Sequence, residues 1–236
     1  MIESDIKLVS IHIPKVAGTS LWYSLREVYG YRQPFRFICK KTGLLQPLVR
    51  VDIFDDDQLL LNDKIYTKKT IPPCVTAIHG HFYFDKLKKT INLDADPFII
   101  TWLRNPADRL VSNYLYFRKI ISNSIGHKHT RDYAFPLMEK NFMQFVRDPR
   151  NQNLMTRYLK GLELARINFI GLQEHYESSL KMLSDMLKWP NTKPFNLNKT
   201  NLEKTSLTLD EKQEIAELNA LDFDLYEYAK SRIGVK

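Results

Sequence analysis

The chain has 236 residues, 44% of them hydrophobic and 26% charged, with a formal net charge of +8 at pH 7. This size and composition are typical of one globular domain, here residues 1–236, and they exclude a disordered or fibrous chain. The two cysteines exclude a disulfide framework, and no stretch approaches the ~20 apolar residues of a membrane span.

The excess of basic residues favours anionic partners, such as a phosphorylated nucleotide, an acidic polysaccharide, nucleic acid or an anionic membrane. Basic and acidic residues are nevertheless interspersed, and basic runs are no longer than pairs such as Lys68-Lys69. Most of the charge is therefore expected on the solvated surface. Nucleic acid is the weakest of these partners, because the sequence contains no recognisable nucleic-acid-binding module.

The first chemically informative segment is 12–20, which reads His-Ile-Pro-Lys-Val-Ala-Gly-Thr-Ser. An apolar run over 8–13 precedes this segment and an amphipathic run over 19–29 follows it, which predicts a strand, a tight loop and a helix. The amides at the helix start, the positive end of the helix dipole and the Lys15 ammonium would all face one phosphate-sized anion. We therefore predict a nucleotide-binding loop with contacts from Lys15, Ala17, Gly18, Thr19 and Ser20.

Residues 31–73 contain several prolines, and we predict irregular structure there with short elements near 35–39 and 59–66. The acidic triplet 55–57 in this region could bind a divalent cation. Adjacent aspartates in a loop are more often a solvated turn, so we assign the triplet no metal.

The run Ala77-Ile78-His79-Gly80-His81 ends an apolar stretch that begins at Cys74, which predicts the end of a strand. Side chains alternate along a strand, so His79 and His81 should face the same side. From the spacing alone, the pair fits ordinary packing, a zinc half-site or a general base with its helper. The metal reading is weak, because the other candidate ligands are scattered along the chain.

Residues 97–103 are short, apolar and β-rich, which predicts a buried parallel strand, and a helical pattern follows from Pro106. Arg104 should then lie at the carboxyl end of a strand, where open α/β sheets bind ligands. A guanidinium suits a dianionic phosphate, and Ser112 on the next helix could supply a hydroxyl to the same anion. Arg109 lies one turn from Ser112 and is predicted to be structural.

The second half of the chain carries further predicted elements. They are a polar loop over 121–135, a strand over 167–172 and an amphipathic helix over 174–187. A polar basic loop over 196–200 follows. Thr208 and Glu211 then form a capping box for one last helix that carries Ile215, Leu218 and Tyr226 in the core.

Three of these motifs together resemble a known family. The order Pro14-Lys15-x-x-Gly18-Thr19-Ser20 differs from the nucleotide-triphosphatase loop, where a lysine directly follows the last glycine. It resembles the 5′-phosphosulfate loop of sulfotransferases that use 3′-phosphoadenosine-5′-phosphosulfate (PAPS), especially the carbohydrate branch related to heparan sulfate 2-O-sulfotransferase. The run Arg104-Asn105-Pro106-x-x-Arg109-Leu110-x-Ser112 looks like the 3′-phosphate motif of that family, and His79-Gly80-His81 resembles its catalytic segment.

The resemblance implies a role for each motif. His81 would take the proton from the acceptor hydroxyl, with His79 as its partner in the site, and Lys15 would stabilise the leaving phosphate. Arg104 and Ser112 would bind the 3′-phosphate of the donor.

The resemblance also implies that a loop containing Asn198 and Lys199 folds over the adenosine bisphosphate product (PAP). The implied reaction transfers a sulfuryl group from PAPS to a hydroxyl and needs no metal. We expect an acceptor hydroxyl on a carbohydrate, which could be acidic, and the residues leave a tyrosine or a lipid hydroxyl open as alternatives. The sequence indicates no oligomeric state.

The implied fold is a single α/β domain with a central, mainly parallel sheet flanked by helices, an architecture shared with P-loop kinases. Two other functions stay open. A nucleotide kinase would need a magnesium ligand after the loop lysine, and a non-catalytic nucleotide or polysaccharide binder could dispense with His81. Golgi members of the family carry an N-terminal anchor, whereas the first residues here carry acids. We therefore expect a cytoplasmic enzyme, or a lumenal Golgi enzyme if an anchor has been removed.

Overall fold

The computed structural model divides the chain into two compact units. The first comprises residues 1–103 and 157–197, and the second comprises residues 104–156 and 198–236. The residues that the structure describes are 6–29, 47–53, 58–65, 71, 75–91, 93, 96–122, 140–189 and 207–234. The predicted elements near 35–39, the acidic triplet 55–57 and residues 123–135 of the predicted loop 121–135 lie outside these residues. The loop prediction was wrong for residues 121–122, which belong to a helix. The prediction of one domain over 1–236 stays a prediction.

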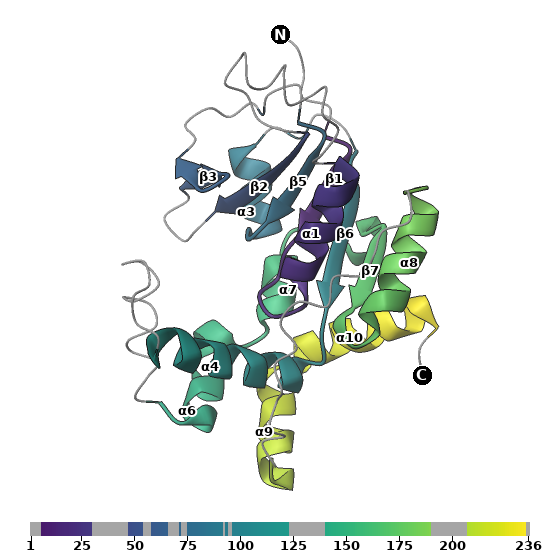
Figure 1. Cartoon of the computed structure of the whole chain (residues 1–236). Helices are drawn as coiled ribbons and strands as arrows, with labels where there is room; N and C mark the ends of the chain where they lie inside the picture. Colours follow the sequence, from purple (N-terminus) through teal and green to yellow (C-terminus); the bar gives the residue numbers. More distant parts are fainter. Residues whose placement is uncertain are drawn as a thin grey trace. The chain divides into compact units, whose positions relative to one another are not determined.

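The first unit is built on a mainly parallel sheet (Figure 1). Within the described residues the strand order is β4-β3-β2-β5-β1-β6-β7, and only β3 and β4 run antiparallel to their neighbours. The strands are β1 Leu8–Ile11, β2 Leu48–Ile53, β3 Leu59–Leu61, β4 Lys64–Ile65, β5 Ala77–Gly80, β6 Phe98–Leu103 and β7 Phe169–Leu172.

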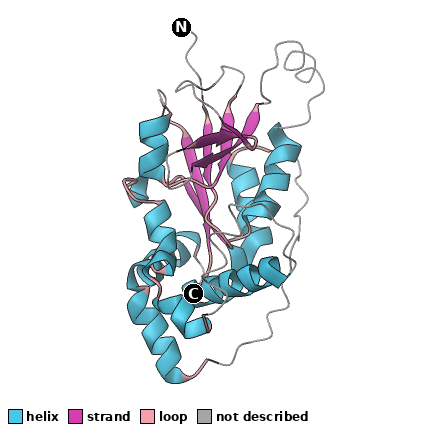
Figure 2. Ribbon diagram, turned by 90° about the vertical axis from the view of Figure 1, so that its left-hand side faces the viewer, coloured by secondary structure: helices cyan, strands magenta, loops and turns pink. Residues whose placement is uncertain are grey.

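Helices cover both faces of this sheet, with the strands between them in Figure 2. In Figure 1, α1 crosses in front of the strands and α3 lies behind them. The helical elements of this unit are α1 Gly18–Tyr29, α3 Phe84–Thr90, α8 Tyr176–Met186 and the short turns η2 Leu164–Arg166 and η3 Gln173–His175. The predicted α/β fold with a mainly parallel, helix-flanked sheet is confirmed.

The central strands are apolar on both faces because helices bury both sides. Every residue of β1 and β5 is buried, as is typical of parallel strands in this kind of sheet. β1 pairs with β5 on one side and with β6 on the other, so that Ile11 lies in register with both Gly80 and Thr101. The chain leaves β1 toward β2 and β5, and only later adds β6 on the opposite side. Ligands of open α/β sheets bind at the carboxyl ends of the strands at such a reversal.

The prediction of irregular structure over 31–73 was wrong for part of that range. β2 runs from Leu48 to Ile53 and continues the parallel sheet beside β5. Its alternating sequence, Leu-Val-Arg-Val-Asp-Ile, carries Arg50 and Asp52 at positions that an ordinary apolar strand would leave hydrophobic. The polar residues and the adjacent acidic triplet therefore masked the strand.

All regular elements among the described residues of the second unit are helices. A buried apolar cluster holds it together and consists of Leu110, Phe145, Val146 and Ile215. The helices are α4 Pro106–Ser122, α6 Phe142–Arg147, η1 Pro149–Asn151, α7 Leu154–Tyr158, α9 Leu209–Leu218 and α10 Ala220–Ile233. No helix among the described residues of either unit is long and apolar enough to cross a membrane.

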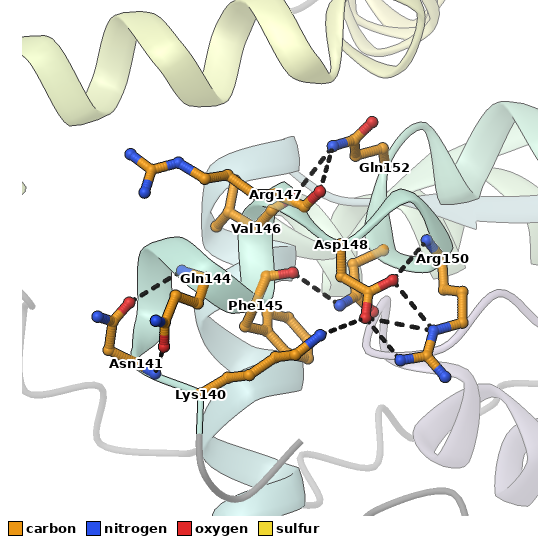
Figure 3. Close-up of polar contacts among 10 residues, drawn as sticks. Lys140, Asn141, Gln144, Phe145, Val146, Arg147, Asp148, Arg150 and Gln152 are labelled. Carbon is orange, nitrogen blue, oxygen red and sulfur yellow. Dashed lines mark hydrogen bonds and ion pairs between the residues drawn. The ribbon is translucent and has the colours of Figure 1, made fainter. Parts of the chain in front are cut away.

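Side-chain caps close both ends of α6 (Figure 3). At its start, Asn141 and Gln144 form a capping box in which each side chain accepts a hydrogen bond from the other residue's backbone amide. At its end, the Gln152 side-chain amide donates to the carbonyls of the last two residues of the helix. Just beyond the helix, the buried Asp148 carboxylate accepts hydrogen bonds from the Arg150 guanidinium and the Lys140 ammonium. The Arg150 hydrogen bonds hold the pKa of Asp148 well below its usual range.

The predicted capping box between Thr208 and Glu211 is confirmed at the start of α9. The prediction of one continuous last helix was wrong, because Asn219 separates α9 from α10. The Asn219 side chain donates to the Ile215 carbonyl and accepts from the Asn153 amide. It therefore ends one helix and also fixes the loop before α7, which local periodicity does not reveal.

Asp222, at the start of α10, is fully buried and caps α7 from a distant part of the sequence. Its carboxylate accepts hydrogen bonds from the Met155 amide at 3.1 Å and from the Thr156 amide and hydroxyl, both at 2.8 Å. An ionised acceptor at a helix start satisfies amides that have no partner within the helix and complements the helix dipole.

We expect Asp222→Ala to lower the free energy of unfolding by about 2–3 kcal/mol, because it leaves buried amides without their acceptor. The matched control is Asp224→Ala, which removes an exposed carboxylate from the same helix and should change stability by less than ~0.5 kcal/mol. Urea unfolding followed by circular dichroism measures both. Equal losses in the two variants would contradict the capping role.

Candidate active site

The loop between β1 and α1 has the backbone of an anion-binding site. Lys15 and Ala17 both adopt a left-handed φ of 72°, and Val16 between them does not. Alternation of this kind turns successive amides toward one concave face. A left-handed conformation costs a non-glycine residue ~1–2 kcal/mol, so the fold maintains this loop against its local preference. Such strain is typical of functional sites.

Helix α1 begins directly after this loop at Gly18. Its first amides, those of Gly18, Thr19 and Ser20, lie at the positive end of the helix dipole and have no acceptor within the helix. Gly18 cannot carry a side chain, because an added Cβ would lie 1.7 Å from the Cδ2 atom of His12. The His12 ring therefore packs directly against the start of the helix.

His81 follows β5, and the structure fixes it at three points. Its amide donates to Asp52 Oδ1 at 3.0 Å, and its carbonyl accepts from the Ile53 amide at 2.9 Å. Its Nδ1 atom lies 2.8 Å from the His12 carbonyl oxygen. A carbonyl can only accept, so Nδ1 carries the proton, and Nε2 of the neutral ring is the lone-pair nitrogen.

The rings of three histidines and one tryptophan form a stack beside the loop. His12 lies between His81 and His79, with ring-centroid distances of 4.0 Å and 4.9 Å. Trp22 of α1 continues the stack at 5.6 Å from His79. Within the stack, His79 is 1% exposed and its Nδ1 lies 2.8 Å from the Ser10 hydroxyl, whereas His12 and His81 are half-buried.

Burial keeps these histidines neutral. It lowers the pKa of His79 to about 3, helped by the nearby His81 and Arg50 and opposed by the Gly18 backbone. Burial also lowers the pKa of His12 well below its ordinary value, and His81, His79, Arg50 and Lys15 add to that effect.

The pKa of His81 is also lowered, mainly by burial and further by Arg50, while Asp52 and the His12 carbonyl act in the opposite direction. At neutral pH the His81 ring is neutral and its Nε2 is unprotonated.

The structure brings one group of predicted residues together. Lys15, Ala17, Gly18, Thr19 and Ser20 form the loop and helix start, and His79 and His81 lie at the end of the neighbouring strand β5. Arg104 directly follows β6 in the chain, and with Ser112 it belongs to the second unit, where Ser112 is buried on α4. Asn198 and Lys199 lie outside the described residues.

Arg109, predicted to be structural, is fully buried and donates to the Asn151 carbonyl at 3.0 Å. This hydrogen bond links α4 to the segment before α7. Arg109 therefore serves the packing of the second unit.

The sequence did not point to three residues of the site. His12 has no histidine or cysteine at metal-ligand spacing, and Arg50 and Asp52 lie on the strand that was missed. His12 precedes His81 by 69 residues in the chain, and Asp52 precedes His81 by 29. Only the parallel pairing of β1, β5 and β2 brings them together. The one available signal was Asp52 itself, a carboxylate in an apolar run.

The described residues contain no group of three or more histidine, cysteine, aspartate or glutamate side chains arranged to hold a metal ion. The chemistry that this site supports comes from an anion-binding loop, a lysine and a neutral histidine with one nitrogen unprotonated. Together these groups suit the transfer of an anionic group to a hydroxyl whose proton must be removed.

Comparisons with known proteins agree with this chemistry. The model of the sulfotransferase family matches residues 1–229, so the chain belongs to that family. The predicted sulfotransferase family is confirmed, whereas the branch related to heparan sulfate 2-O-sulfotransferase stays a prediction. A search of curated proteins finds no match.

The solved structures that are similar to this chain include two sulfotransferases. One is mouse sulfotransferase SULT7A1 complexed with PAP, at 13% identity and a TM-score of 0.48, covering 91% of this chain and 63% of that one. The other is a sulfotransferase from Alicyclobacillus acidocaldarius, at 11% identity and a TM-score of 0.46, covering 99% of this chain and 97% of that one. The chain thus spans less than two thirds of the length of the mouse protein.

Gly80 allows β2 to approach β5 closely enough to fix His81. A Cβ at Gly80 would lie 1.7 Å from the Val51 carbonyl oxygen. We expect Gly80→Ala to lower the free energy of unfolding by about 3 kcal/mol, because a backbone atom cannot move aside without breaking the strand pairing. Thermal unfolding measures the loss.

The control for this variant is Gly234→Ala. Gly234 has a φ of 70° and no atom within 4 Å of an added Cβ, so only the conformational cost of ~1 kcal/mol applies. If Gly80→Ala lowers the free energy of unfolding no more than Gly234→Ala does, the close approach of the Val51 carbonyl does not require a glycine at position 80.

Proposed function

We propose that this protein transfers the sulfuryl group of PAPS to a hydroxyl of a carbohydrate acceptor, as in the branch related to heparan sulfate 2-O-sulfotransferase. The observation that carries the proposal is the juxtaposition of a strained lysine loop and the neutral His81, at the carboxyl ends of β1 and β5. Membership of the sulfotransferase family supports the same reaction. PAPS supplies the sulfuryl group and leaves as PAP.

The loop residues fit the 5′ end of such a donor. Lys15 and the amides of Gly18, Thr19 and Ser20 would bind the 5′-phosphate and stabilise the negative charge that develops on it when the bond to sulfur breaks. The left-handed conformations of Lys15 and Ala17 support this role, because they preorganise the loop before the anion arrives.

His81 acts as the general base in this proposal. The His12 carbonyl holds the proton on Nδ1, so Nε2 can accept a proton from the acceptor hydroxyl. The same hydrogen bond stabilises the imidazolium that forms. Because His79 is buried, we propose no contact between its ring and the acceptor. Its proposed role is to pack against the His12 ring from within the core.

Other residues are assigned to the donor by their motifs. Arg104 and Ser112 would bind the 3′-phosphate, since a guanidinium forms paired hydrogen bonds with a phosphate dianion. Asn198 and Lys199 would contact the adenosine bisphosphate.

An aromatic pair downstream of His81 supports a carbohydrate acceptor. Phe82 is buried, so the half-buried His81 and Tyr83 flank it on the more exposed side of the segment. The rings of Tyr83 and Tyr158 lie 4.7 Å apart, and the Arg157 and Lys86 cations each lie 5.9 Å from the Tyr83 ring. Aromatic faces bury the apolar faces of sugars, and the two cations would favour an acidic sugar.

The donor can be tested by calorimetric titration with PAP and, separately, with ATP. We expect micromolar binding of PAP and negligible binding of ATP, because the loop lacks the magnesium ligand that follows the lysine of a triphosphatase. Preferential binding of ATP would instead support a nucleotide kinase.

The catalytic roles can be separated by His81→Ala and Lys15→Ala. We expect His81→Ala to lower kcat by about 10²–10⁴-fold and to leave PAP binding nearly unchanged, because it removes the base alone. Lys15→Ala should lower kcat by about 10²–10³-fold and also weaken PAP binding. Sulfate transfer from labelled PAPS to a panel of sugars measures the rates.

The exposed His175 and Lys64 provide matched controls, and their alanine variants should retain full activity. His12→Gln tests the neighbouring ring of the stack. A kcat loss in His12→Gln comparable to that expected for His81→Ala, with His81→Ala active, would move the base to His12. Full activity in both variants with PAP still bound would leave a non-catalytic nucleotide binder.

A further inference from the structure

Asp52 is a buried carboxylate directly behind the proposed base. It is 2% exposed, and its two oxygens have different partners: Oδ1 accepts from the His81 amide at 3.0 Å, and Oδ2 accepts from Arg50 Nε at 2.8 Å. A buried charge is costly unless it is paired and hydrogen-bonded, so this arrangement needs a compensating benefit.

We infer that Asp52 and Arg50 are a pair of positioning residues that fix the His81 backbone and set the charge around its ring with opposite signs. The inference adds to the proposed function and rests on it in one respect, the role of His81 as the base. Neither residue is expected to touch the donor or the acceptor.

The positioning step follows from the register of the strands. β2 pairs with β5 up to Arg50 and His79, and beyond that point Gly80 lets the Val51 carbonyl approach. The Asp52 carboxylate then accepts a hydrogen bond from the His81 amide, and the Ile53 amide donates one to the His81 carbonyl. The strand pairing is thus extended past the end of β5 by one side chain, which leaves the His81 ring little freedom.

The electrostatic step follows from which charged groups face His81. Asp52 and Arg50 face it from β2, the His12 ring and carbonyl face it from the β1–α1 loop, and the neutral His79 precedes it on β5. Asp52 stabilises the protonated ring and raises the pKa of His81, whereas Arg50 destabilises it and lowers that pKa. Lys15 acts on the neighbouring His12.

A purely structural ion pair would behave differently. The Arg50 side chain is 41% exposed, so its attraction to Asp52 is partly screened, and it also lies 3.8 Å from the exposed Asp63. If the pair served only to hold β2 in the sheet, loss of either partner would reduce stability. The two losses would then not shift the pKa of His81 in opposite directions.

The test compares variants that keep the shape of each side chain and remove its charge. Asp52→Asn keeps an oxygen for the His81 amide, and Arg50→Gln keeps a donor for Asp52. Arg50→Lys retains the charge, and Asp63→Asn removes a carboxylate that contacts Arg50 from the exposed side. The readouts are the NMR titration of the His81 ring, assigned with His81→Gln, and the pH profile of sulfate transfer.

Asp52→Asn should move the His81 titration, and the acid limb of the activity profile, to lower pH, because the imidazolium loses its counter-charge. Arg50→Gln should move both to higher pH, because a repulsive charge is gone. The two controls should leave both readouts near the wild-type position. Shifts in the same direction, or no shift in either variant, would overturn the inference.

The NMR titration needs no substrate, so it separates the two hypotheses. Opposite NMR shifts together with absent sulfate transfer would contradict the proposed function and leave the pairing of Asp52 and Arg50 around His81 established. Unshifted NMR titrations in an enzyme that transfers sulfate would overturn the role of Asp52 and Arg50 and leave the proposed function in place.

Discussion

The site depends on one backbone constraint, the parallel register that places Ile11 of β1 beside Gly80 of β5. The His12 amide donates to the Gly80 carbonyl at 2.8 Å, which continues this pairing past both strand ends. As a result, the first residue after β1 and the first residue after β5 stack ring against ring. A shift of the register by one residue would move every side chain of one strand to the opposite face of the sheet. The lysine loop and His81 therefore depend on the same strand pairing.

The neutrality of the histidine stack has a consequence for anion binding. Three protonated imidazoles this close together would repel one another, and burial makes each charge more costly. With the rings neutral, Lys15 and the helix dipole are the positive groups of the loop. The loop then attracts an anion through fixed backbone amides and one ammonium, and the neighbouring His81 keeps the lone pair that a base needs. In the proposed function, anion binding and proton transfer therefore use separate groups.

The parts of the fold that the sequence predicted are those specified by local pattern. β1, α1 and β6 follow from apolar runs and from the loop between them, and the capping box of α9 follows from two residues three apart. β2 was missed because its polar residues serve His81, which lies far along the chain. The break at Asn219 was missed for a related reason, since its side chain binds Asn153 as well as its own helix. Local sequence patterns fail to predict an element where its side chains contact residues far away in the chain.

The same distinction separates the two halves of the candidate site. The donor loop is contiguous in sequence, so its resemblance to a phosphosulfate loop was readable from a few adjacent residues. The environment of His81 is assembled from β1, β2 and β5, with contacts that span 29 and 69 residues. The sequence could therefore identify His81 by its motif but could not give its proton position or its pKa. Those properties belong to the sheet, because the His12 carbonyl and the Asp52 carboxylate reach the ring and backbone of His81 only when all three strands are paired.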